Sequence, residues 1–355
     1  MASGGTDSYE SAVNKNETVA QFEDTRKSLG HRIQHWLHQT PSAVPMIVLL
    51  ASVILFGLAA DNFFRAGVLT LILQQIAVVG ILGCAQSIVI LTAGIDLSVG
   101  AMAVFTSVIM GQFTFRYGIP APISILVGLG AGTLMGMANG ALVAYVKLPP
   151  FIVTLGTWQI ILAANFLYSQ NETIRSQDIA AEAPMLQLFG ATFRVGGTTV
   201  TLGVILLVLV VLTMAYVLRH TAWGRHVYAV GDDAEAAALS GVQVKKMLVH
   251  VYALAGFFCA LAGWVMIGRY GSVSPAAATG QIGNIQSITA VVIGGISLFG
   301  GRGSILGMFF GALIVGVFEL GLRLLGTDPQ WTYLLIGVLI IGAVAVDQWI
   351  RKVSA

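Results

Sequence analysis

A single carboxylate, Asp96, stands between two long apolar runs in the stretch Gly94 to Ser98 (GIDLS). Placing such a charge within or beside a membrane span costs about 2.5–3.5 kcal/mol on insertion scales unless it meets partners or water. Asp96 can therefore cap the helix that follows through backbone N–H groups, or it can line or gate a polar path. The sequence leaves both interpretations open.

Other polar side chains in or beside the apolar runs offer amides, hydroxyls and one aromatic ring. Such groups can line a path for a polar molecule, and they can equally well join one helix to another by hydrogen bonds. Together with Asp96, the candidates are Ser98, Asn139, Thr154, Thr157, Trp158, Gln159, Asn165, Asn284 and Gln286.

The longest informative hydrophilic stretch is Thr221 to Lys246. Asp232 or Asp233 can cap a short helix, residues 234–239 favour helix, and Gly241 suits the left-handed residue that ends one. We expect a compact helix that projects from the surface. Its candidate contact residues, which include the pattern EAA-x-x-x-G, are Asp232, Asp233, Glu235, Ala236, Ala237 and Gly241.

Several kinds of chemistry are not expected. The nearest approach to a phosphate-binding loop, Gly295 to Arg302 (GISLFGGR), lacks the Lys-Ser/Thr pair, so the chain should not hydrolyse ATP by itself. No hydrolase elbow, H-E-x-x-H pair or paired-cysteine motif occurs, and Cys84 and Cys259 read as small buried hydrophobes, so we predict neither an enzyme nor a metal site. A net charge of +2 with scattered basic residues gives no reason to expect nucleic-acid binding.

The elements that must position these residues are membrane helices. The 355 residues are 56% hydrophobic and 10% charged, whereas an ordinary soluble domain carries about 25% charged residues. Apolar runs of about 17 to 25 residues, the length that crosses a bilayer, recur along the chain. The ten predicted spans are Val44 to Ala60, Ala66 to Thr92, Val99 to Phe115, Pro122 to Val146, Phe151 to Tyr168, Val200 to Leu218, Leu248 to Ile267, Ile285 to Phe299, Ser304 to Leu322 and Trp331 to Val346.

Positive charge orients these spans and places both termini in the cytoplasm. We expect a cytoplasmic tail at residues 1–43, a membrane domain at 44–350 and a short cytoplasmic tail at 351–355. Residues 24–39 suit an amphipathic helix on the membrane surface or, equally, a solvated leader. Residues 169–199 should form an external loop and residues 219–247 a cytoplasmic one. The second span is too long for one straight upright helix, so it should break or tilt.

An internal repeat relates two of the spans. Gly130 to Val146 and Gly301 to Val317 are identical at eight of 17 positions, and the predicted topology runs them in opposite directions. We therefore predict an all-α fold of two inverted five-helix halves, an architecture of transporters. Glycines four residues apart should let helices pack closely, lining a pore being the lesser alternative. They are Gly132, Gly136 and Gly140 in one copy and Gly303, Gly307 and Gly311 in the other.

From about residue 45 onward the chain resembles the permease subunits of bacterial ABC importers for monosaccharides. Four stretches carry the resemblance: GIDLSVG at 94–100, LPPFIVTLGT at 148–157, WGRHVYAVG at 223–231 and GGISLFGGRGS at 294–304. The overall likeness is greatest to fructose importers, ahead of ribose and xylose importers. The family's pattern has acidic residues where Asn284 and Gln286 stand, and this departure weakens any transfer of the substrate.

The resemblance implies a homodimer in the bacterial inner membrane. An external sugar-binding protein would deliver the substrate, and a separate ATPase subunit, using ATP and Mg, would dock on the EAA-x-x-x-G helix. The permease itself would bind no cofactor. The main alternative is an ion-coupled secondary transporter, for which Asp96 and Glu319 are the only acidic candidates. We expect Glu319 to pair with Arg323 instead, since the two lie four residues apart.

Overall fold

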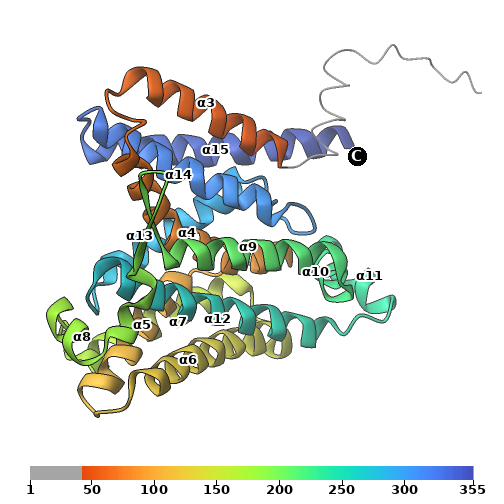
Figure 1. The fold of residues 1–355 in the computed structure, drawn as a ribbon. Coiled ribbons are helices and arrows are strands. Elements are labelled where there is room, and N and C mark those ends of the chain that lie inside the picture. The colour runs from red at the N-terminus through yellow and green to blue at the C-terminus, as the bar shows by residue number, and fades with distance from the viewer. Residues whose placement is uncertain (1–41, 355) are drawn as a thin grey trace, which may run out of the picture. The chain divides into compact units, whose positions relative to one another are not determined.

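The computed structural model describes residues 42–354, so the predicted surface helix at 24–39 lies outside the described residues. Each of the ten predicted spans overlaps one long helix (Figure 1). Their bounds are α3 Ala43–Ala59, α4 Ala66–Leu91, α5 Val99–Phe115, α6 Ala121–Ala141, α7 Pro150–Ser169, α9 Leu202–His220, α12 Val244–Tyr270, α13 Ala277–Ile293, α14 Ile305–Leu324 and α15 Pro329–Ser354. A π-helical turn, Leu142–Val146, extends α6.

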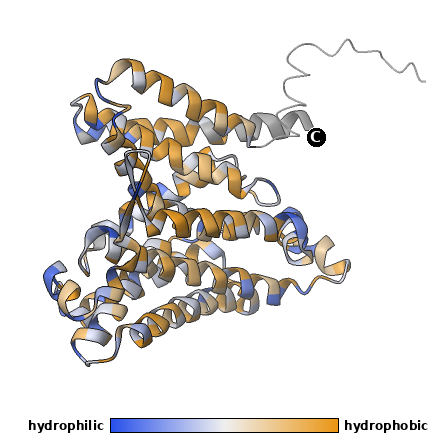
Figure 2. Cartoon of the chain, viewed as in Figure 1, coloured by the Kyte–Doolittle hydropathy of each residue, from blue (hydrophilic) through white to orange (hydrophobic). Residues whose placement is uncertain are grey.

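Six of these helices are long and apolar enough to cross a membrane, namely α4, α6 with its π-helical turn, α7, α9, α12 and α14. Shorter apolar helices at Ala43–Ala59, Val99–Phe115 and Gln330–Gly342 accompany them. Hydrophobic residues dominate the long helices (Figure 2), and in α4, α5 and α12 they are spread around the helix rather than gathered on one face. A helix that is apolar all round suits lipid or a protein interior rather than water.

Two helices, α4 and α12, occupy the centre of the packing. They contact each other, and about two thirds or more of the most apolar window of each is buried. By contrast α7 buries only 22% of its window, and its Ile160 and Leu167 are strongly exposed. The outer helices therefore present apolar surface to whatever surrounds the chain, while α4 and α12 hold the interior.

Glycines let two pairs of helices approach closely. A Cβ on Gly132, Gly136 or Gly140 of α6 would meet the backbone or Cβ atoms of α12, and one on Gly307 or Gly311 of α14 would meet the backbone of α13 and the glycine that follows it. The third predicted member of the second stripe is misplaced: Gly303 lies before α14, with φ at +128°. Its Cβ would strike Ile296 rather than a neighbouring helix.

Two boundaries differ from expectation. The second span is one unbroken helix, α4, so it does not break, and the alternative of a tilted span stays a prediction. The eighth span begins at Ala277 and ends at Ile293 instead of running from 285 to 299. The stretch beyond Ile293 is apolar, but Gly295, Gly300 and Gly301 adopt positive φ there, and an α-helix requires negative φ. Hydropathy extended the helix into a connection that the backbone does not allow to be helical.

The connections between α7 and α9 and between α9 and α12 lie at opposite ends of the long helices (Figure 1). The first folds into α8 Ser176–Glu182, a 3-10 helix at Pro184–Gly190, and the hairpin β1 Thr192–Val195 and β2 Thr198–Thr201. Its strands pair antiparallel around Gly196 and Gly197, both at positive φ. The second holds α10 Ala222–Asp232 and α11 Ala234–Leu239. We refer to these as the α8 end and the α11 end.

Candidate translocation and coupling sites

The segment between α4 and α5 collects the polar residues that the sequence singled out. Asp96 is almost fully buried, and its Oδ1 accepts hydrogen bonds from the Ser98 N–H at 2.8 Å and the Ser98 hydroxyl at 2.6 Å. The Asn139 amide of α6 donates to Ser98 Oγ at 3.0 Å. The Thr154 hydroxyl of α7 donates to the Ile95 carbonyl at 3.0 Å. Two helices, α6 and α7, are thereby fastened to the α4–α5 loop.

Asn284 of α13 completes this arrangement, which we call the polar cluster (Asp96, Ser98, Asn139, Thr154 and Asn284). Its amide nitrogen donates to the Leu97 carbonyl, and its Oδ1 accepts from the Gly100 N–H at 2.6 Å. Asn284 stands where an acidic residue was expected, and a carboxylate could not make the first of these bonds because it has no N–H to donate. The neutral amide therefore suits a position facing both a carbonyl and an N–H.

The proposed cap at Asp96 is corrected in one respect. Ser98 occupies the N-cap position just before α5, and its side chain accepts no hydrogen bond from the helix amides. Asp96 lies two residues earlier and holds the turn that precedes the helix. Its second oxygen, Oδ2, is buried without a described partner, as are Asn139 Oδ1 and the Tyr252 hydroxyl.

The remaining candidates do not join the polar cluster. Thr157 donates to a carbonyl of its own helix at Thr154, and Gln159 is exposed. Trp158 and Asn165 line a small cavity beside α5, where Asn165 also donates to the Pro275 carbonyl at 2.8 Å. Gln286 donates to Glu319 on α14 at 2.8 Å. The ten residues thus occupy several separate positions among the helices.

Glu319 is also the centre of a network that sequence reasoning missed. Arg323 pairs with it as predicted, at 3.5 Å. In addition, Gln75 of α4 donates to Glu319 and accepts from Arg269 of α12. The signal available in the sequence was an arginine, Arg269, that follows an apolar run at the end of α12, because a charge there requires partners.

Arg269 and Gln286 line a cavity of about 410 Å³ among α4, α5, α12 and α13. The residues that line it include Gly100, whose N–H donates to Asn284 of the polar cluster. Ser272 and Ser274 form its wall at the α8 end.

The hydrophilic stretch at the α11 end folds as two helices, of which the sequence predicted the second. Asp233 caps α11, accepting from the N–H groups of Glu235 at 2.9 Å and Ala236 at 3.0 Å, and Gly241 has φ at +90°. Both features are confirmed. Leu239, the last residue of α11, is 91% exposed.

The first helix, α10, is bound tightly to the two loops between helices at this end. The Tyr228 hydroxyl donates to the Gly303 carbonyl at 2.9 Å, and burial raises the pKa of Tyr228 above its usual value. A Cβ on Gly231 would overlap the Leu91 carbonyl and the Gly301 N–H, which are bonded to each other at 3.0 Å. The end of α10 thus touches both the α4–α5 loop and the α13–α14 loop.

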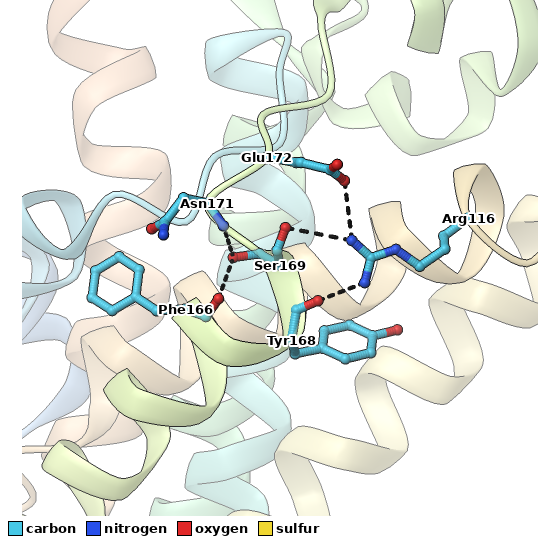
Figure 3. Close-up of polar contacts among 6 residues, drawn as sticks. All are labelled: Arg116, Phe166, Tyr168, Ser169, Asn171 and Glu172. Carbon is cyan, nitrogen blue, oxygen red and sulfur yellow. Dashed lines mark hydrogen bonds and ion pairs between the residues drawn. The ribbon is translucent and has the colours of Figure 1, made fainter.

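A second set of contacts fixes the start of the connection at the α8 end (Figure 3). Arg116, after α5, donates to the Tyr168 carbonyl at 2.7 Å and pairs with Glu172 at 3.0 Å. Two residues further on, Ile174 forms an antiparallel bridge with Val273, between α12 and α13. The loop is therefore fastened to both α5 and the α12–α13 connection.

Comparisons with known proteins agree with the resemblance seen in the sequence. The chain is 67% identical over 338 residues to the fructose import permease protein FrcC of Rhizobium meliloti, covering 95% of this chain and 93% of that protein. It is 34% identical to the ribose import permease protein RbsC of Escherichia coli K12, over 88% of this chain and 94% of the relative. No solved structure matches.

The galactose/methyl galactoside import permease protein MglC of Haemophilus influenzae is also 34% identical, over 78% of this chain and 84% of its own. A family model described as the permease component of the branched-chain amino acid transport system matches residues 68–344. This match spans most of the chain, and the relatives align over nearly their whole lengths. The chain belongs to this family of transport permeases.

Proposed function

We propose that this chain is the membrane subunit of a bacterial ATP-driven importer that carries a monosaccharide, fructose in the first instance, into the cytoplasm. The single observation that supports fructose as the substrate is the 67% identity to a fructose import permease over 95% of the chain. Ribose remains the second candidate because ribose permeases are related at 34% identity. We further propose that two copies form the pore, in the inner membrane, with both termini cytoplasmic.

The geometry of the α11 end supports docking of a separate ATPase subunit there. The contact residues would be Asp232, Asp233, Glu235, Ala236 and Gly241, with the exposed Leu239 inserted in a groove of the ATPase. Ala237, which the sequence pattern also suggested, is buried against the chain itself and is not available to a partner. Because α10 touches the α4–α5 and α13–α14 loops, a push on α11 would reach both loops at once. ATP and Mg would be bound by that partner.

The pairing of helices supports two inverted five-helix halves. Within the proposed order, α6 corresponds to α14, α12 to α4, and α5 to α13. The contacts respect this correspondence: α6 packs on α12 and on α5, while α14 packs on α4 and on α13. In many transporters, alternating access arises because one inverted repeat rocks against the other around a fixed substrate site.

Uptake by reconstituted proteoliposomes tests the proposal. With the cognate ATPase and the external binding protein present, fructose should accumulate only when ATP and Mg are supplied on the side of the membrane that carries the ATPase. Deleting residues 232–241 should abolish both ATPase co-purification and uptake while the chain still inserts. Uptake by this chain alone, driven by an ion gradient and indifferent to ATP, would instead establish the secondary transporter.

A further inference from the structure

The 410 Å³ cavity has the size and lining of a site for one small polar molecule. Ligand sites of small molecules span about 300–1,000 Å³, so this cavity is at the small end. One side is apolar, with Val78, Val79 and Leu82 of α4. The other carries hydroxyls, an amide and a guanidinium, from Ser107, Arg269, Ser272, Ser274, Thr279 and Gln286.

Several of these polar groups have capacity left for a ligand. The side-chain hydroxyls of Ser272, Ser274 and Thr279 form no hydrogen bond with any residue that the structure describes. Gln286 spends its N–H₂ group on Glu319, which leaves its carbonyl oxygen as an acceptor. A guanidinium carries five N–H donors, and Arg269 donates two hydrogen bonds to Gln75, so the other N–H groups remain for a ligand. Donors and acceptors are therefore mixed, as the hydroxyl groups of a sugar require.

The charge balance favours a neutral ligand. Arg269 has no carboxylate within ion-pair distance among the described residues, but Gln75 links it to Glu319 by two hydrogen bonds. The negative charge of Glu319 thus lies one side chain away from the guanidinium. Arg323, which also bonds Glu319, has a side chain 72% exposed, so water screens its charge. An anion at Arg269 would meet the field of Glu319, whereas a neutral polyol would not.

The cavity lies where a molecule arriving at the α8 end would enter. Its wall at Ser272 and Ser274 flanks Val273, which the bridge to Ile174 attaches to the large loop. Tyr270 and Ile282 at the same end are exposed. Its floor at Gly100 borders the polar cluster. A ligand held here would lie between the α7–α9 connection and the α4–α5 loop.

We propose that this cavity is a transit site for one neutral monosaccharide molecule, held by Arg269, Gln286 and the hydroxyls of Ser272 and Ser274. The inference rests on the proposed function for the identity of the cargo. Gln75 and Glu319 are positioning residues, since they orient the guanidinium and the amide without touching the sugar.

Cysteine protection in the assembled transporter tests the site directly. Both native cysteines are fully buried, and Ile282 lines the cavity without being one of the groups proposed to hold the sugar, so Ile282→Cys adds one reactive thiol beside an unaltered site. A membrane-impermeant maleimide should label it from the α8 end, and millimolar fructose should slow the labelling. Gln177→Cys on α8, exposed and outside the cavity, is the matched control and should react at the same rate with or without fructose.

Two arginine variants in the Ile282→Cys background separate binding from structure. Arg269→Gln should raise the half-protecting fructose concentration by at least about tenfold, since it removes charge-assisted hydrogen bonds. Arg323→Gln, which also touches Glu319 but does not line the cavity, should leave it within about twofold.

The outcomes distinguish the two proposals. If wild-type proteoliposomes import fructose but the Ile282→Cys variant is labelled equally with and without the sugar, the transit site is wrong while the proposed function stands. Protection by glucuronate and not by fructose would overturn the assignment of a neutral ligand. Absence of ATP-driven fructose uptake by the wild type would remove the proposed function itself.

Discussion

At the scale of single residues, Asp96 is a buried carboxylate, so its hydrogen-bond partners must be identified. Its Oδ1 receives the N–H and the hydroxyl of Ser98, and through Ser98 it is connected to Asn139 on α6. These bonds lie inside the protein and hold the α4–α5 loop in shape. The proposed path and the internal support of the loop are therefore two roles that a substitution can separate.

Asp96→Ala should lower the free energy of unfolding by about 1–3 kcal/mol, because it leaves the buried Ser98 donors without an acceptor. Asp96→Asn keeps a carbonyl oxygen and should cost less. Thermal unfolding of the detergent-solubilised protein measures both, with the exposed Asp178→Ala as the control. Unchanged stability of Asp96→Ala together with lost uptake would assign Asp96 to the path instead.

Asp233 combines two properties, a helix cap and a negative charge, that bear on the proposed coupling differently. Asp233→Ala removes the acceptor for two helix N–H groups, which typically weakens a helix by about 0.5–2 kcal/mol. Asp233→Asn keeps the cap and removes the charge. If the cap is what matters, only Asp233→Ala should reduce the affinity of the ATPase in a pull-down titration. Equal losses for both variants would show that the charge is recognised.

At the scale of elements, the approach of α6 to α12 gives a matched pair of glycines on one helix. A side chain at Gly136 would overlap the Tyr252 carbonyl, whereas a Cβ at Gly130 would meet nothing within 4 Å. Gly136→Leu should destabilise the fold by about 1–3 kcal/mol or more through overpacking, and Gly130→Leu should be close to neutral. Melting temperatures of the two variants check this, and similar values would exclude close packing at Gly136.

How far the sequence could predict these elements depended on what each element required. Apolar length predicted the approximate position of each long helix except α13, whose start it placed eight residues too late, since a span must satisfy its backbone internally. Length and hydropathy carry no information on φ, so they placed Gly294 and Gly295 inside a helix. The helix α10 was missed because Trp223 to Gly231 contains two glycines and several residues of low helix propensity. Its contacts with distant loops, such as Tyr228 to Gly303, supply what local propensity does not.

The candidate site was predictable to a lesser degree. A buried carboxylate and intramembrane amides can be recognised from their cost in lipid, which is why Asp96, Asn139 and Asn284 were singled out. Their grouping depends on how four helices and a loop pack, and a single sequence does not show this. The link from Arg269 through Gln75 to Glu319 joins residues up to 244 positions apart, and nothing in their local spacing relates them.

At the scale of the whole molecule, the proposed topology predicts on which side of the membrane each end of the long helices lies. Gln177 on α8 and Leu239 on α11 lie at opposite ends of the long helices (Figure 1). In intact cells, Gln177→Cys should react with an impermeant maleimide and Leu239→Cys should not, until the inner membrane is opened. Equal reactivity of both before lysis would contradict the placement of the α11 end in the cytoplasm.

The hairpin of β1 and β2 has a further consequence for how such a chain could have arisen. Its tip at Gly196 and Gly197 falls after the fifth and before the sixth of the long helices. If each long helix crosses the bilayer, an odd number of crossings precedes the tip, so a gene copied and joined head to tail at this point yields a second half that is upside down with no extra helix to turn it over. The hairpin is then the seam of an ancestral fusion. Two polypeptides separated at that seam should still assemble when they are made together.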